Sequence, residues 1–472
     1  MAIPDNIFRG YDIRGVVGTE LNPEVFSRLG QAYATFLVCH RVRDCVVGMD
    51  VRETSEEYKN AFVSSMVEAG INVIDIGLSL AQIVYFSQYY FQSKGAAMIT
   101  ASHLPREYNG LKLASGFSDT LLGEEIQEIR RLAQSGDFKS FPEKGSVRKE
   151  DVFAAYKADI GKRANIKDSG LKIVIDCSNA TAGAFLPDIL REAGCQVIEQ
   201  NTELDGTFPV GTPDPTEKDV LERLGKKVKE EKANLGVSYD CDGDRLGVVD
   251  EDGNLIWNDL LVAIFAKDIL DFLPGGKIVF NVLCSKATSD VIREAGGEPV
   301  VWKTGHSFIK AKVKQERAPF GGELSGHFFF MDNFYGHDDG AIATLRLLAY
   351  LKRTGKSLKE VISGLPKYIS SPEIKLGLAD DIKFKLIEGP IANDLKSLFP
   401  GAQYLTIDGM RVDTESEMAV IRASQNGPYI TIKFEAQDIE RYNSLKEKIS
   451  SLLHKYEEID FKSGVNTSAF EK

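Results

Sequence analysis

The sequence predicts an α/β protein with three related α/β domains, each with a mixed sheet, followed by a C-terminal α+β domain. Two observations carry this prediction. A unit of strand, helix and strand recurs three times, and after about residue 370 the pattern changes to strands alone. A chain of 472 residues is also too long for one hydrophobic core.

The repeated unit first runs from CVVGMD to EAGINVIDIG, at residues 45–77. The second copy runs from KIVIDCSNATAGAF to EAGCQVIEQ, and the third from KIVFNVLCSKATSDV through EAGGEPVVW. Each helix ends in Glu-Ala-Gly, and Gly70, Gly194 and Gly296 stand where a helix C-terminus favours a left-handed residue. The β-branched strands are typical of sheets covered on both faces.

The last part of the chain contains EIKLGL, AQYLTI, MAVIRA and YITIKF, predicted as strands without intervening helices. One long amphipathic helix closes it. Its apolar residues recur at helical spacing, and we expect them to form its buried face: Ile439, Tyr442, Leu445, Ile449, Leu452 and Tyr456. The predicted domains cover residues 1–150, 151–257, 258–369 and 370–472.

Composition excludes several classes of partner. A net charge of -12 argues against nucleic acid or an anionic membrane. The N-terminus is polar, and the longest apolar stretch covers only residues 260–266, so we expect a cytoplasmic protein. The six cysteines contain no C-x-x-C pair, which predicts buried thiols in a reducing compartment. Oligomeric state is not readable, and a monomer is the default.

The segment VSYDCDGDRLGVV predicts a divalent cation beside an anionic substrate. Two carboxylates about 4 Å apart repel by roughly 4 kcal/mol, so Asp240, Asp242 and Asp244 need a cation among them. Oxygen ligands favour Mg²⁺, Ca²⁺ or Mn²⁺. An EF-hand would need glycine where Arg245 stands. An aspartyl phosphatase, with Asp240 as the phosphorylated residue, remains an alternative.

A second candidate site follows the strand GAAMIT, where Ser102 opens a polar loop. Such a serine is either a turn residue or a nucleophile. His103 could orient or deprotonate it, and Lys112 could hold an oxyanion.

Further candidates lie in later loops. His306 opens a helix, so its ring and the helix amides could share a phosphate or a sugar hydroxyl, or it could simply cap the helix. In GGELSGH, Glu323 and Ser325 are expected on one side of an extended segment, suited to sugar hydroxyls. Arg422 precedes a Ser-Gln-Asn-Gly-Pro turn that either wraps a phosphate or is an ordinary hairpin, and Lys433 is expected on the polar face of the returning strand.

Together these segments resemble the α-D-phosphohexomutase family, most closely its phosphomannomutase/phosphoglucomutase branch. The resemblance covers nearly the whole chain, with FRGYDIRG, TASHLPREYNGLK, DCDGDR, KTGHSFIK, GGELSGH and RASQNGP in the family's order. It implies four domains arranged around a central cleft, each contributing one loop.

The resemblance also implies roles for individual residues. Ser102 would be phosphorylated, and Asp240, Asp242 and Asp244 would bind Mg²⁺ together with the phosphate of Ser102. The residues at the reacting end would be Tyr11, Arg14, His103, Lys112, Arg245 and His306. The residues binding the rest of the substrate would be Lys286, Glu323, Ser325, Arg422, Ser424, Gln425, Asn426 and Lys433.

The implied activity is interconversion of hexose 1-phosphate and hexose 6-phosphate through a phosphoserine enzyme. The intermediate is a hexose 1,6-bisphosphate, which also serves as activator. The substrate is a small phosphosugar; mannose and glucose are not distinguished. The alternatives are a phosphoglucosamine mutase, an aspartyl sugar phosphatase and a non-catalytic sugar-phosphate-binding protein. The acceptor of the hydroxyl proton is left open among His306, His103 and a Lys112 of low pKa.

Overall fold

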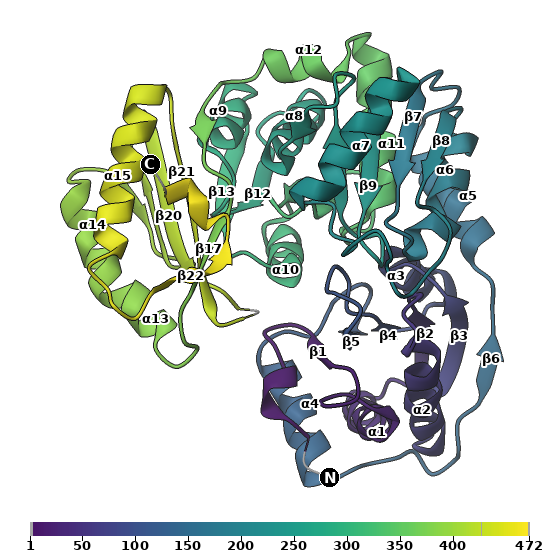
Figure 1. Cartoon of the computed structure of the whole chain (residues 1–472). Coiled ribbons are helices and arrows are strands. Elements are labelled where there is room, and N and C mark those ends of the chain that lie inside the picture. The colour runs from purple at the N-terminus through teal and green to yellow at the C-terminus, as the bar shows by residue number, and fades with distance from the viewer. Residues whose placement is uncertain (1–2, 426, 471–472) are drawn as a thin grey trace. The chain divides into compact units, whose positions relative to one another are not determined.

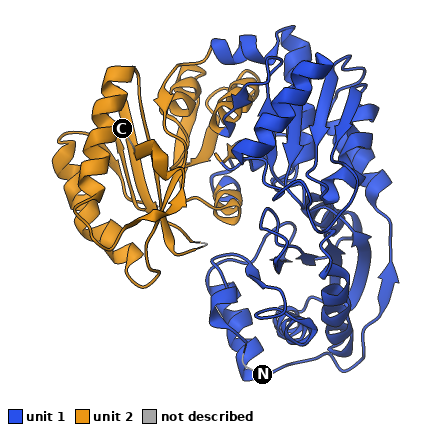
Figure 2. Cartoon of the chain, in the orientation of Figure 1, with its two compact units in different colours: residues 1–258, 313–320, 325–363 blue, residues 259–312, 321–324, 364–472 orange. Residues whose placement is uncertain are grey.

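A computed structural model describes residues 3–425 and 427–470. The chain divides into two compact units, shown in Figure 2. Unit 1 contains residues 1–258, 313–320 and 325–363, and unit 2 contains residues 259–312, 321–324 and 364–472. The four domain boundaries expected from the sequence stay predictions.

The first sheet of unit 1 is mixed, with the strand order β1-β5-β4-β2-β3-β6 (Figure 1). Strand β2 is parallel to β3 and β4, whereas β5 is antiparallel to β4 and β1. The strands in chain order are β1 (Ile13–Val16), β2 (Asp44–Met49), β3 (Asn72–Leu78), β4 (Gly95–Ile99), β5 (Tyr108–Ser115) and β6 (Val147–Lys149).

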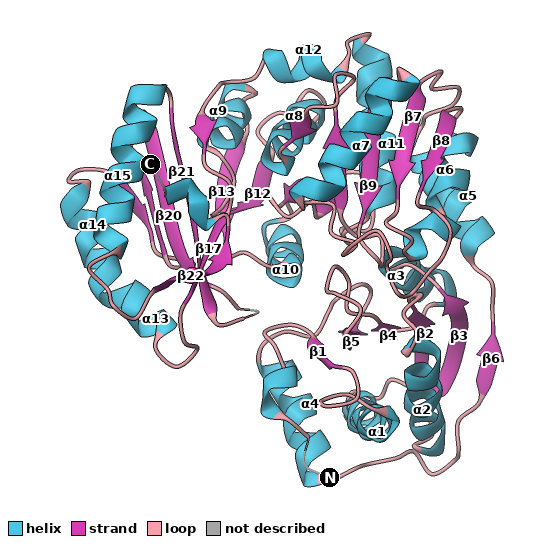
Figure 3. Ribbon diagram, in the orientation of Figure 1, coloured by secondary structure: helices cyan, strands magenta, loops and turns pink. Residues whose placement is uncertain are grey.

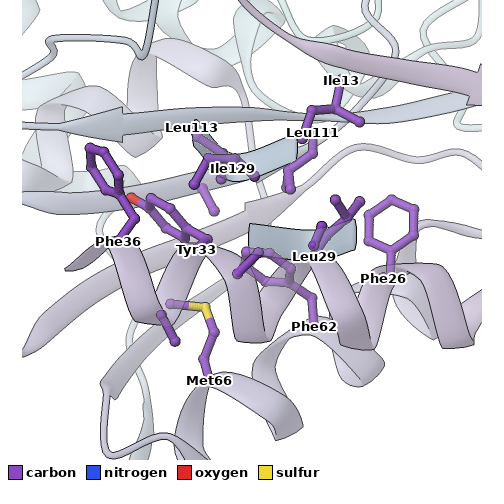
Figure 4. Close-up of a cluster of buried hydrophobic side chains, with 14 of the residues drawn as sticks. Ile13, Phe26, Leu29, Tyr33, Phe36, Phe62, Met66, Leu111, Leu113 and Ile129 are labelled. Atoms are coloured by element: carbon purple, nitrogen blue, oxygen red, sulfur yellow. The ribbon is translucent and has the colours of Figure 1, made fainter. Parts of the chain in front are cut away.

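Alternate residues of this sheet enter two hydrophobic cores, as the two-residue period of a strand requires. Val47, Ala97 and Leu113 join the core beneath α1, α2 and α4, which Figure 4 shows. Their neighbours Val46, Ala96 and Ala114 join α3 in the core on the other face. The helices are the short 3-10 helix η1 (Asp5–Ile7), α1 (Pro23–Cys39), α2 (Ser55–Glu68), α3 (Ala81–Phe91) and α4 (Glu124–Ser135).

The second sheet has the order β11-β10-β9-β7-β8 and is also mixed. Strand β7 is parallel to β8 and β9, and β9 forms an antiparallel hairpin with β10. The strands are β7 (Lys172–Asp176), β8 (Gln196–Gln200), β9 (Leu235–Tyr239), β10 (Leu246–Val249) and β11 (Leu255–Ile256). The helices of this region are α5 (Phe153–Ala164), η2 (Thr181–Ala184), α6 (Leu186–Glu192), α7 (Lys218–Glu231), α11 (Gly340–Thr354) and α12 (Leu358–Ser363).

The third sheet has the order β13-β12-β14-β15. Its elements are α8 (Asn258–Leu270), β12 (Lys277–Asn281), α9 (Lys286–Glu294), β13 (Glu298–Trp302), α10 (His306–Glu316), β14 (Phe320–Gly322) and β15 (Phe328–Phe330). The predicted repeat is confirmed, because β2–β3, β7–β8 and β12–β13 are each parallel pairs joined through a helix (Figure 3). Gly70, Gly194 and Gly296 end those helices with φ of 88°, 79° and 76°.

The C-terminal part of unit 2 is built on an antiparallel sheet that contains the order β18-β19-β20-β21-β17-β22, with β16 also paired to β21. Its strands are β16 (Ile369–Ser370), β17 (Ile374–Gly377), β18 (Gln403–Leu405), β19 (Met410–Asp413), β20 (Glu417–Ala423), β21 (Tyr429–Ala436) and β22 (Asp460–Val465). The predicted class of three α/β domains with mixed sheets and an α+β domain is therefore confirmed.

Two details of this last part differ from the prediction. A helical segment does intervene between strands: α13 (Lys383–Leu386), a π-helical turn (Ile387–Ile391) and α14 (Ala392–Leu398) separate β17 from β18. In the closing helix α15 (Ile439–Leu453), Leu445, Ile449 and Leu452 are buried, but Ile439 is 59% exposed. Helical spacing identifies a face, but it does not show where along the helix the sheet stops covering it. A last 3-10 turn, η4, covers Thr467–Phe470.

The cysteines are free thiols, and five of them are buried as expected. Cys39, at the end of α1, is exposed, which corrects that part of the prediction. Within the described ranges, no helix is both long and apolar enough to cross a membrane.

Candidate active site

Ser102 lies in the loop between β4 and β5, three residues after the end of the fully buried strand β4. Its φ of 51° is left-handed, a conformation that costs a non-glycine residue of order 1 kcal/mol and is common at functional sites. Its amide donates to Thr100 Oγ1 at 2.8 Å, which holds this turn. Its hydroxyl donates to Asp240 Oδ2 at 2.6 Å, and His103 Nδ1 lies 3.4 Å from Oγ. The structure thus brings the two strongest motifs of the sequence together.

The three aspartates occupy the tip of the β9–β10 hairpin. Tyr239 pairs with Leu246, so residues 240–245 form a tight connection in which Gly243 has a φ of 73°. Because a strand, and not a helix, follows the loop, the EF-hand alternative is excluded. The carbonyl of Asp242 accepts from the amide of Ala81 at 3.0 Å, and the carbonyl of Gly243 accepts from Gln82 Nε2 at 2.9 Å. Helix α3 therefore holds the aspartate loop, residues 240–245.

This loop fits a hard divalent cation. Asp240, Asp242 and Asp244 are fully buried, and each offers an oxygen within 4.8 Å of the others. Burial raises the pKa of Asp240 well above its usual range, and the carboxylates of Asp244 and Asp242 raise it further. Among the described residues, Asp242 Oδ1 has no hydrogen-bond partner. An oxygen-only site of three crowded carboxylates suits Mg²⁺ or a similar ion better than zinc.

Lys112 stands against the same carboxylates. Its ammonium lies 2.7 Å from Asp242 Oδ2 and 2.5 Å from Asp244 Oδ2, and the side chain is 3% exposed. Burial lowers the pKa of Lys112, but Asp242 and Asp244 raise it by more, so the net pKa is well above the usual value. The direction of this shift is opposite to the one that a general base at neutral pH would need.

Two arginines, Arg14 and Arg245, contact the residues around Ser102. Arg14, on β1, makes an ion pair with Asp12 and places Nη1 3.5 Å from the carbonyl of Ala101. Arg245 donates its amide to Asp240 Oδ1 at 3.1 Å. Burial lowers the pKa of each arginine, but the neighbouring groups together raise it above its usual value, with Asp12 foremost among them at Arg14 and Asp214 and Asp240 at Arg245. The phenol of Tyr11 interacts electrostatically with both guanidinium groups.

His327 is one of four histidines, with His103, His306 and His337, that fall in the candidate segments of the sequence, but it has no individual role in the sequence-based prediction. Its Nε2 accepts from Arg245 Nε at 3.0 Å, so its hydrogen is on Nδ1, which lies 3.0 Å from Asp338 Oδ2. Asp244, His327 and Asp338 form a second group of ligand atoms that shares Asp244 with the first. The available signal was the position of His327 at the end of GGELSGH, directly after Ser325 and Gly326.

The remaining candidates lie in unit 2, apart from Ser325, which belongs to unit 1. His306 opens α10 as predicted. Glu323 Oε1 accepts from the amide of Gly305 at 2.7 Å, directly before that helix. Residues 324–325 form a turn, so the predicted extended segment is wrong there; Gly326, with a φ of 91°, ends it.

The predicted phosphate-binding hairpin is present as β20 and β21, with Arg422 opposite Thr431. Arg422 Nε donates to Asp408 Oδ2 at 2.7 Å, and the same oxygen accepts from the amide of Thr304 at 2.9 Å. Asp408 therefore ties the hairpin to the KTGH turn, a link that no sequence pattern indicated. Ser424 closes the hairpin through its amide, which donates to the carbonyl of Tyr429. Gln425 follows, half-buried, and Asn426 lies outside the described residues.

Two predicted substrate lysines have other surroundings. Lys433 is buried and not on a polar face: its ammonium contacts Asp259 Oδ2 at 2.8 Å and the carbonyl of Leu283 at 3.1 Å, which favours a structural role. Lys286 begins α9 and lines a cavity of about 480 Å³ with Arg293, Arg411 and Glu415. None of the other predicted substrate residues that the structure describes belongs to that lining. The substrate-binding roles of these two lysines stay predictions.

The fold and the site together define an enzyme class: an α/β phosphotransferase with a buried serine against a carboxylate triad that could hold a metal ion. Comparison with known proteins agrees. Models of the phosphoglucomutase/phosphomannomutase α/β/α domains I, II and III match residues 5–140, 153–253 and 257–368. The chain belongs to the phosphoglucomutase/phosphomannomutase family.

Individual relatives match along nearly their whole length. A phosphomannomutase/phosphoglucomutase of Pseudomonas putida is 36% identical over 456 residues, 97% of each chain. A phosphoglucomutase of Neisseria gonorrhoeae is 36% identical, covering 96% of this chain and 98% of its own. The solved structure of a phosphoglucomutase/phosphomannomutase family protein from Burkholderia thailandensis has a TM-score of 0.88 at 33% identity, covering 96% of this chain and 98% of its own.

Proposed function

We propose that the chain is a phosphohexomutase that interconverts the 1-phosphate and 6-phosphate of mannose, glucose or both. The observation that carries the proposal is the hydrogen bond of 2.6 Å from Ser102 to Asp240, inside a triad of buried carboxylates and beside Lys112. A nucleophile, a metal site and fixed cations are thus within one compact unit. Family membership supports the same activity.

In this proposal Ser102 carries a phosphoryl group on Oγ. The bond between phosphorus and Oγ breaks as a new bond forms to the free sugar hydroxyl, which yields a hexose 1,6-bisphosphate. The guanidinium and ammonium groups of Arg14, Lys112 and Arg245 donate to the phosphoryl oxygens, where charge is spread during transfer. His103, whose Nδ1 lies 3.4 Å from Oγ, and His306 remain the candidates for accepting the hydroxyl proton.

The three aspartates and the phosphate on Ser102 would hold Mg²⁺, which would neutralise charge on the transferring group. The other phosphate would be held by Arg422 and Ser424 with the turn after them, and sugar hydroxyls by Glu323 and Ser325. The bisphosphate then turns over, and its second phosphate returns to Ser102. We further propose a cytoplasmic monomer that acts on a small phosphosugar and is activated by hexose 1,6-bisphosphate. The net charge of -12 disfavours nucleic acid and membranes as partners.

The test is a coupled assay of glucose 1-phosphate and mannose 1-phosphate, with Mg²⁺ and a trace of the 1,6-bisphosphate. Ser102→Ala is expected to reduce turnover to less than about a tenth while substrate affinity stays within about tenfold, because the serine supplies covalent chemistry. Mass spectrometry should find phosphate on Ser102 of the wild type.

Ser118→Ala is the matched control, because Ser118 is also buried in the first domain with a φ of 57°. Its hydroxyl lies against Tyr89, and we expect this variant to retain turnover. Turnover of Ser102→Ala above a tenth of wild type would overturn the phosphoserine assignment.

A further inference from the structure

One buried arginine gathers almost the whole loop that carries Ser102. Arg52, 3% exposed, donates Nη2 to the carbonyls of Ser102 at 2.7 Å and Leu104 at 2.6 Å. Its Nη1 donates to the carbonyls of Pro105 at 2.8 Å and Tyr108 at 3.0 Å. With Nε on Asp50 Oδ2 at 3.1 Å, all five N–H groups of the guanidinium have an acceptor.

This contact explains how the loop holds an unfavourable conformation. Four carbonyl dipoles of residues 102–108 point at one place, which is repulsive unless a cation occupies it. The loop also contains the left-handed Ser102. A planar guanidinium can serve several carbonyls in fixed directions, whereas a lysine ammonium has three donors and one centre. Arg52 is thus the group that keeps the loop in this shape.

The ion pair of Arg52 and Asp50 also contacts the aspartate loop, residues 240–245. Asp50 Oδ2, which accepts from Arg52, lies 3.5 Å from the thiol of Cys241. In the sequence, Cys241 stands between Asp240 and Asp242. The next residue, Val51, donates its amide to Thr181 Oγ1 at 2.9 Å, and that hydroxyl is 3.6 Å from the same thiol. The Ser102 loop and the aspartate loop therefore both contact the buried ion pair of Asp50 and Arg52, which follows β2.

The segment that contains Gly206 and Phe208 packs over the guanidinium of Arg52. The ring of Phe208 lies 5.0 Å from the guanidinium carbon of Arg52. Gly206 allows this approach, because a Cβ there would lie 2.5 Å from the carbonyl oxygen of Val51. Arg52 is 3% exposed, so water has little access to the guanidinium whose N–H groups make these hydrogen bonds.

We propose that Arg52, oriented by Asp50, is a positioning residue for phosphoryl transfer. It sets the place of Ser102 Oγ relative to the carboxylates of Asp240, Asp242 and Asp244 without contacting the substrate itself. This inference rests on the proposed function and adds to it a determinant of rate that lies outside the metal, sugar and phosphate loops. A displacement of about 1 Å at Ser102 is enough to lower the rate on the order of 100-fold.

The test compares Arg52→Met and Arg52→Lys with Lys59→Met. Lys59 makes a buried ion pair with Asp75 in the same domain, at 2.7 and 2.9 Å, and does not contact the Ser102 loop. All variants are measured for thermal midpoint, for kcat and KM, and for the rate at which glucose 1,6-bisphosphate phosphorylates Ser102.

We expect Arg52→Met to lower kcat and the phosphorylation rate at least about 30-fold, with KM within about threefold, because binding groups stay in place. Lys59→Met is expected to lose a similar amount of thermal stability but to keep kcat within about twofold. Arg52→Lys should recover stability and not rate, because one ammonium cannot serve four carbonyls.

The outcomes are separable. If the wild type is not phosphorylated at Ser102, the proposed function fails, and this inference fails with it. If the wild type turns over and Arg52→Lys keeps kcat within about threefold, the positioning role alone is overturned. The positioning role is also overturned if Lys59→Met loses as much kcat as Arg52→Met at an equal loss of stability, because the loss of kcat would then follow from lower stability alone. Should Arg52→Met not fold, the comparison of Arg52→Lys with Lys59→Met decides.

Discussion

Asp339 makes the stability of the protein depend on pH in a predictable direction. Its carboxylate is buried, caps α11 by accepting from the amide of Ile342 at 3.0 Å, and accepts from the hydroxyl of Tyr156 at 2.8 Å. Burial raises the pKa of Asp339 to about 7, although both hydrogen bonds lower it. Asp339→Asn keeps an acceptor oxygen for the amide of Ile342, turns an NH2 donor towards the hydroxyl of Tyr156, and removes the ionisation, so it tests the effect of the charge.

The sign follows from linkage. Because the folded pKa lies above the unfolded one, the contribution to stability is complete below the unfolded pKa and is lost as pH rises through the folded pKa. Each pKa unit corresponds to about 1.4 kcal/mol, so between pH 5.5 and pH 8.5 the wild type should lose about 2 kcal/mol relative to Asp339→Asn. For a unit of this size that corresponds to a change of roughly 3 °C in the difference between thermal midpoints.

Scanning calorimetry with EDTA across that pH range measures the difference. The control is Asp438→Asn, since Asp438 also caps a helix, by accepting from the amide of Arg441, but its side chain is 50% exposed. Water solvates that charge, and we expect a constant difference between this variant and the wild type. A constant difference for Asp339→Asn as well would refute the reasoning, because burial would then not have shifted the ionisation.

Two further predictions concern the ligand. Asp242→Asn removes one of the three carboxylates of the triad, so we expect weaker Mg²⁺ binding in titration calorimetry together with slower turnover; normal turnover in EDTA would contradict the metal assignment. Arg422→Lys loses the planar fork that Asp408 orients, so KM should rise by up to about tenfold and more hexose 1,6-bisphosphate should escape during turnover. Phosphorus NMR measures that release, and an unchanged release with an unchanged KM would mean that the turn is only a hairpin.

Local patterns in the sequence determined the architecture well. The three strand–helix–strand units and their terminal glycines depend on periodicity and on one left-handed residue, both of which are local. The aspartate loop was also readable, because repulsion among close carboxylates is a property of the motif itself. The helical segment at residues 383–398 was missed, since short helices with a weak apolar stripe resemble loops.

Tertiary structure decided what each charged side chain does. Arg422 and Lys433 are both cations of one hairpin, but Arg422 meets Asp408 near the KTGH turn whereas Lys433 is buried against Asp259. The pKa of Lys112 is raised and not lowered, because the fold places two carboxylates beside it. Arg52 gathers carbonyls that lie 50 to 56 residues away in sequence. A residue's type and spacing are written in the chain, but its electrostatic partners come from segments far apart in sequence, and only folding brings those partners together.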